Sequence, residues 1–147
     1  MVQQTKPTVL AIGIAGLRFR TSLLDVYTAT RLREAIGTIQ LICFDLMVVG
    51  LENPRLDVWE LIQRVLAAWP HQRWILVSKR VTAEDEVQAR SLGALMVLYE
   101  FPEEVWLADF AASLRRRDLS RSVRTLVATV DMLSPRINGV AVHAEAT

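Results

Sequence analysis

The stretch LICFDLMVVG, residues 41–50, decides the fold because it combines an apolar run with a single acid, Asp45. Short runs that are apolar on both faces are typical of strands covered on both sides within a parallel sheet. We interpret QLICFDL, residues 40–46, as such a buried strand. This interpretation places Asp45 at the carboxyl end of the strand, where little nearby would hold a carboxylate.

Similar runs recur along the chain and are predicted to form the other strands. They are TVLAIGI (8–14), RWILVS (73–78), ALMVLY (94–99) and the weaker LDVYTA (24–29). Helical patterns separate the later runs: residues 56–69 have apolar positions at helical spacing, Thr82 is a predicted N-cap of a helix that stops at Gly93, and another helix opens at Pro102. The alternation predicts an α/β fold with a doubly wound, five-stranded parallel sheet.

The connection between the first two predicted strands is short. TVLAIGI and LDVYTA leave fewer residues than the ~10–12 that a crossover helix needs. We therefore expect a stunted first helix or a loop there.

Composition limits the class of protein. The chain has 147 residues, of which 52% are hydrophobic, which suits one full core with an appendage. Lys and Arg number 17 and Asp and Glu 16, so no overall field draws it to nucleic acid or an anionic membrane. Cys43 is the only cysteine, which excludes an internal disulfide and a cysteine-based zinc cluster. The opening MVQQTKP is unlike a secretory signal, and a cytoplasmic location is expected.

Several segments together resemble the receiver domain of bacterial response regulators. They are FDL (44–46), the strand that ends in Val77-Ser78, Gly93-Ala94 before the fifth strand, and DVYTATRLREA (25–35). The likeness covers roughly residues 8 to 114 and implies a flavodoxin-like fold. It also implies an aspartate that accepts a phosphoryl group with the help of magnesium, an acidic pair, a hydroxyl and a lysine.

The resemblance assigns few of these roles to the chain. Asp45 matches the phospho-acceptor and Ser78 the switch hydroxyl, but Gly13 and Ile14 stand where the acidic pair should be. Glu100 stands in place of the lysine. A phosphoryl group needs cationic partners. We therefore expect a degenerate receiver with no catalytic residues, no metal and no cofactor, in which Asp45 is a vestigial acceptor.

The C-terminal part carries a separate pattern. Apolar residues repeat at four-three spacing, as in a coiled-coil seam: Leu119, Val123, Leu126, Val130 and Leu133. This predicts a helix over 119–133, which either packs on its own domain or pairs with a second subunit as a dimer interface. The predicted organisation is a receiver-like domain over 1–117 and an extension over 118–147. The arginines at 115–117 are read as a solvated helix face, so no nucleic-acid partner is expected.

The hypothesis from the sequence is a non-enzymatic, receiver-like signalling module that works by protein–protein interaction, as a homodimer or as an adaptor. One alternative is a phosphorylatable single-domain response regulator of a two-component system with Asp45 as acceptor. The other is a nucleotide-binding Rossmann-like module, because AIGIAG (11–16) resembles the glycine fingerprint with one glycine replaced. The partner, the pathway and the oligomeric state stay open at this point.

Overall fold

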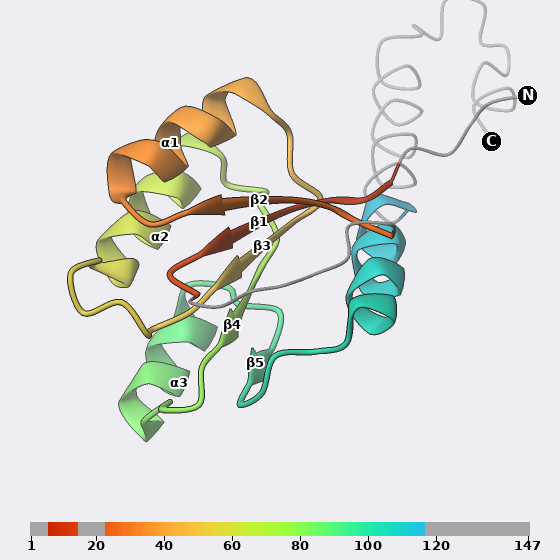
Figure 1. Ribbon diagram of the computed structural model, residues 1–147. Helices are drawn as coiled ribbons and strands as arrows, with labels where there is room; N and C mark the ends of the chain where they lie inside the picture. The colour runs from red at the N-terminus through yellow and green to blue at the C-terminus, as the bar shows by residue number, and fades with distance from the viewer. Residues whose placement is uncertain (1–5, 15–22, 117–147) are drawn as a thin grey trace, which may run out of the picture. The chain divides into compact units, whose positions relative to one another are not determined.

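The computed structural model describes residues 6–14 and 23–116, which form a parallel sheet covered by helices (Figure 1). The strands are β1 (Thr8–Ile12), β2 (Asp25–Ala29), β3 (Leu46–Val49), β4 (Trp74–Val77) and β5 (Val97–Leu98). They lie in the order β2-β1-β3-β4-β5, and all neighbours are parallel. The predicted doubly wound, five-stranded sheet is therefore confirmed.

The described residues form four helices, of which the second and third begin at side-chain caps. They are α1 (Leu32–Leu41), α2 (Val58–Ala68), α3 (Ala83–Ser91) and a helix over residues 104–116. Asp57 caps α2 by accepting a hydrogen bond from the Glu60 N–H at 3.1 Å. Thr82 and Asp85 form a reciprocal capping box at the start of α3, with both bonds at 3.1 Å. These caps satisfy amide donors that a helix start otherwise leaves unpaired.

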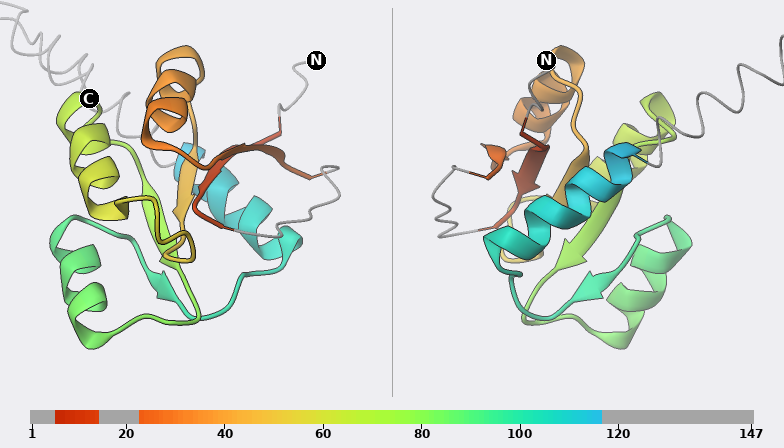
Figure 2. Two further views of the ribbon diagram at one scale, coloured as in Figure 1. Left: turned by 60° about the vertical axis from the view of Figure 1, so that its left-hand side comes forward. Right: turned by 90° about the vertical axis from the view of Figure 1, so that its right-hand side faces the viewer.

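Alternate strand residues face opposite layers of the molecule. Leu10 and Ile12 of β1 belong to the core under α1, α2 and α3, whereas Val9 belongs to the core under the helix over 104–116. Figures 1 and 2 show the three labelled helices on one side of the sheet and the blue helix on the other. All four residues of β3 and of β4 are buried, as expected for central strands covered on both faces.

The predicted strand over 40–46 is wrong, and the error moves Asp45. Residues 32–41 form α1, whose inward face buries Ala35 and Ile39, and the strand begins only at Leu46. The cause is that the residues on both sides of Asp45 are equally apolar, so composition does not locate the strand within the run. Asp45 therefore precedes β3 instead of ending it.

Three sequence-based predictions lie outside the described residues. They concern the stunted first helix in the connection that includes 15–22, the helix over 119–133 with its apolar seam, and the boundary after residue 117. Within the part of the chain that is described, no helix is long and apolar enough to cross a membrane.

Candidate functional site

Two glycines meet at the carboxyl ends of the central strands. Gly13 follows β1 and Gly50 follows β3, both are buried, and the Gly50 N–H donates to the Ile12 carbonyl at 2.8 Å. A Cβ atom on Gly13 would lie 2.7 Å from the Gly50 carbonyl oxygen, and Gly13 has a φ of +68°. A Cβ atom on Gly50 would lie 2.7 Å from Ile14 Cγ1 and 2.9 Å from the Gly13 carbonyl oxygen. Backbone atoms and the Ile14 side chain fill this place, which has no room for a side chain at either glycine.

Ser78 lies beside this glycine pair, at the end of β4. It is 2% exposed, and its hydroxyl oxygen accepts a hydrogen bond from the Arg80 N–H at 3.3 Å. It lines a hollow of about 510 Å³ together with Leu51, Glu52, Pro54, Lys79 and Arg80. The structure thus places Ser78 at the carboxyl edge of the sheet, as predicted. Its hydrogen bond also gives it an ordinary role in the turn after β4.

Asp45 lies at the opposite edge. Its Oδ2 accepts a hydrogen bond from the Thr8 N–H at 2.9 Å, and its own N–H donates to the Thr8 carbonyl at 2.9 Å. The strand rise of about 3.3 Å per residue puts the five-residue step to Gly50 at roughly 16 Å. The predicted position of Asp45 at the carboxyl end of a strand is therefore wrong. Its carboxylate is bonded to the first amide of β1.

Metal ligands do not gather in the described part of the chain. Over residues 6–14 and 23–116, no group of three or more His, Cys, Asp or Glu side chains could hold an ion together. Glu52 is the one carboxylate in the lining of the Ser78 hollow, where Lys79 and Arg80 contribute positive charge. A magnesium ion binds weakly through a single carboxylate.

A polar network crosses from α3 to the loop after β5. The Tyr99 hydroxyl donates to Glu86 Oε2 at 3.0 Å, and Arg90 donates to Glu86 Oε1 through two nitrogens at 3.0 and 3.2 Å. The bond from Arg90, followed by that from Tyr99, holds the pKa of Glu86 below its usual value. The same bond to Glu86 raises the pKa of Tyr99 above its usual value. This network links β5 to α3 on the surface of the domain.

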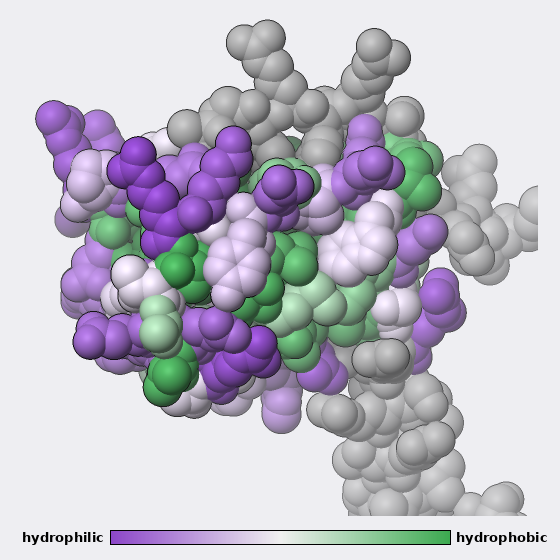
Figure 3. All heavy atoms as spheres, turned by 90° about the horizontal axis from the view of Figure 1, so that it is seen from below, coloured by the Kyte–Doolittle hydropathy of each residue, from purple (hydrophilic) through white to green (hydrophobic). Residues whose placement is uncertain are grey.

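Exposed apolar side chains lie on α3, in the loop after β5 and on the helix over 104–116. Val87 of α3 is 68% exposed, Tyr99 is 52% exposed, and Val105 of the helix over 104–116 is 59% exposed. Trp106 stacks on Phe110 with ring centroids 5.1 Å apart. Figure 3 shows the molecule from this side, with green apolar surface in the centre and purple hydrophilic surface around it. We call this surface, formed by α3, β5 and the helix over 104–116, the α3–β5 face.

The arrangement of the sheet and helices is that of known signalling domains. A response regulator receiver domain from Francisella aligns with a TM-score of 0.62 and 19% identity, covering 77% of this chain and 99% of that one. The chain has the receiver-domain fold. The non-phosphorylated HemR receiver domain from Leptospira biflexa aligns with a TM-score of 0.57 and 22% identity, covering 76% and 93%.

A third solved structure is similar over the same extent. It is the N-terminal domain of an uncharacterised protein from Wolinella succinogenes, with a TM-score of 0.66 and 17% identity, covering 80% of this chain and 99% of that one. No protein-family model matches the chain, and no curated protein matches it in sequence. The likeness to receivers is thus one of fold.

In receiver terms, the chain carries glycine at the place where the acceptor strand ends. That place belongs to Gly50, which was not predicted from the sequence. The residue after β1 is Gly13, which the sequence indicates only as a departure from the acidic pair. Glu100 lies exposed after β5, where the resemblance expects a lysine. Only the contact between Gly13 and Gly50 could have identified the pair, and that contact joins residues far apart in sequence.

Proposed function

We propose that this chain is a receiver-like signalling module that acts by protein–protein contact and does not depend on phosphorylation. The observation that carries the proposal is the close packing of Gly13 and Gly50, since it leaves no carboxylate and no space for one at the end of the acceptor strand. A phosphoryl group also needs cations in a fixed geometry. Asp45, the acceptor suggested by the sequence, points instead to the amide of Thr8.

The α3–β5 face supports contact as the output. Tyr and Trp side chains and apolar side chains gather there at high exposure, which is typical of a surface that binds a protein partner. The hydrogen bond from Tyr99 to Glu86 links the loop after β5 to α3, and Arg90, one turn along α3, bonds the same carboxylate. The resemblance to receiver domains also implies a partner surface over residues 82–114, because receivers commonly bind partners through the fourth helix, the fifth strand and the fifth helix.

The proposal predicts that small phosphodonors leave the protein unmodified. The full chain is incubated with acetyl phosphate and magnesium and its intact mass is measured, with a phosphorylatable receiver domain treated in parallel. We expect no added phosphoryl mass, and no change in amide NMR spectra on addition of beryllofluoride. A phosphoryl mass on the wild type that is missing from Asp45→Asn would establish the phosphorylatable regulator and end the proposal.

A second prediction concerns self-association. We propose that the seam at Leu119–Leu133 pairs two subunits, so sedimentation of the full chain should show a dimer that Leu126→Glu converts to a monomer with unchanged circular dichroism. A charge in an apolar seam of two helices costs several kcal/mol. Trp106→Glu is the matched variant on the α3–β5 face and should leave the dimer intact. A wild type that stays monomeric at all concentrations would contradict the pairing of two subunits through this seam.

The dinucleotide-binding alternative has less support. Of the fingerprint AIGIAG, Gly13 is described, and its lack of a side chain is explained by the 2.7 Å approach to the Gly50 carbonyl oxygen. A structural reason thus accounts for this glycine without a pyrophosphate.

A further inference from the structure

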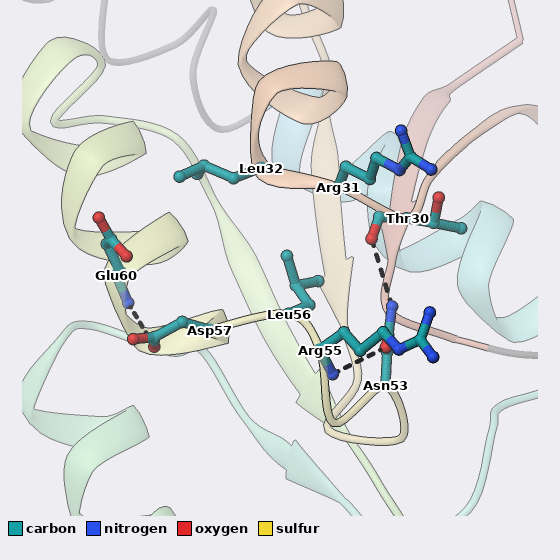
Figure 4. A pocket seen from close by; sticks show the side chains of 8 residues that line it. All are labelled: Thr30, Arg31, Leu32, Asn53, Arg55, Leu56, Asp57 and Glu60. Atoms are coloured by element: carbon teal, nitrogen blue, oxygen red, sulfur yellow. Dashed lines mark hydrogen bonds between the residues drawn. The ribbon is translucent and has the colours of Figure 1, made fainter.

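A hollow of about 760 Å³ opens at the carboxyl edge of the sheet, between the β2–α1 loop and the β3–α2 loop (Figure 4). It is lined by Thr30, Arg31, Leu32, Asn53, Arg55, Leu56, Asp57 and Glu60. Its volume lies within the roughly 300–1,000 Å³ of small-molecule sites. Ligands of open parallel sheets bind outside the carboxyl ends of the strands. The hollow thus has the size and the place of a ligand site.

The two acids in its lining are already engaged. Asp57 Oδ1 accepts the N–H of Glu60 as the N-cap of α2. Glu60 Oε1 pairs with Arg64 at 2.9 Å, one turn further along the helix. Both carboxylates therefore have their partners within α2. Neither pairs with an arginine on the other side of the hollow.

The two arginines of the hollow, in contrast, have no acidic partner among the described residues. Arg31 and Arg55 are both exposed. Figure 4 shows their side chains extending to the same side of the hollow, one from each loop. Arg31 is also the N-cap residue of α1, and it makes no side-chain capping bond, so the first amides of that helix have no side-chain acceptor there.

The hollow is held in shape by a bond between its two loops. Asn53 donates from Nδ2 to the Thr30 carbonyl at 3.3 Å, and its Oδ1 accepts the Arg55 N–H at 3.0 Å. This single side chain fixes the β2–α1 loop against the β3–α2 loop and positions the backbone of Arg55. Leu32 and Leu56 give the same hollow an apolar part.

We propose that this hollow binds a small phosphate monoester. Arg31 and Arg55 would contact the phosphate oxygens, and Leu32 and Leu56 would contact the apolar part of the ligand. The donors of a guanidinium group match the spacing of phosphate oxygens. Two arginines also stabilise a doubly charged phosphate more than they stabilise a singly charged carboxylate. Such binding is non-covalent and separate from phosphorylation of the chain, so the inference holds or fails independently of the proposed function.

Phenyl phosphate and inorganic phosphate are suitable probes for the full chain. Calorimetry should give saturable binding of phenyl phosphate, with a weaker affinity for inorganic phosphate because that ion lacks a group for the two leucines. Amide NMR shifts on titration should centre on residues 30–34 and 53–57. Arg31→Gln and Arg55→Gln should each weaken binding about tenfold, the equivalent of one charge-assisted hydrogen bond.

Arg90→Gln is the matched control, since this exposed arginine lies in α3 and is already bonded to Glu86. It should bind phenyl phosphate as tightly as the wild type does. Absence of saturable binding by the wild type would overturn the proposal. An equal loss in Arg90→Gln would also overturn it by showing unspecific attraction, and benzoate binding as tightly as phenyl phosphate would overturn the assignment to phosphate.

Discussion

Replacing Gly50 by aspartate should strongly destabilise the domain instead of rebuilding a phosphorylation site. The new Cβ would lie 2.7 Å from Ile14 Cγ1, 2.9 Å from the Gly13 carbonyl oxygen and 3.2 Å from that of Val77. Two of these three neighbours are backbone atoms in strand ends, which cannot move aside cheaply. The carboxylate would also face carbonyl oxygens in a buried place. We expect a loss of at least about 3 kcal/mol.

Urea unfolding followed by circular dichroism measures this loss, and Gly37 offers a matched comparison. Gly37 lies inside α1, and nothing lies within 4 Å of the position that its Cβ would take. Gly37→Ala should therefore gain up to ~1 kcal/mol from helix propensity, whereas Gly50→Ala should lose stability through the contacts given above. A Gly50→Asp chain with the wild-type midpoint would show that the strand ends can separate to admit an acid.

The general fold could be predicted from the sequence because burial on both faces leaves a clear pattern. RWILVS contains β4, and the helix expected over 56–69 contains α2 with its cap at Asp57. Thr82 was correctly predicted as an N-cap because a hydroxyl followed by acids satisfies and complements a helix start. These signals are local, so one sequence is enough to find them.

The candidate site could not be predicted because its geometry is not local. The run from Leu41 to Val49 is apolar on both sides of Asp45, and only the length of α1 shows which half is the strand. Placing the strand before Asp45 instead of after it moves this acid from one edge of the sheet to the other. Likewise, the bond between Asn53 and Thr30 joins loops that lie 23 residues apart in sequence. Neither loop alone indicates a hollow.

Replacing Trp74 by alanine should produce the other large loss of stability. Trp74 is 1% exposed in the central strand β4, and its indole Nε1 donates to the Leu92 carbonyl at the end of α3 at 3.3 Å. Ala89 is the one residue of α3 that is fully buried, so this helix has few apolar contacts of its own. Removing a buried tryptophan side chain costs about 3–5 kcal/mol through lost burial and a cavity.

Trp74→Phe separates the hydrogen bond from the packing. It keeps most of the aromatic volume and leaves the Leu92 carbonyl without its donor, so a loss of roughly 1–2 kcal/mol is expected. Hydrogen exchange should then accelerate in the amides of α3 before it does in those of α2, which has four buried residues. Equal acceleration in both helices would contradict the view that Trp74 anchors α3. Trp74 thus links the core to α3, the helix that carries Val87 and Glu86 of the α3–β5 face.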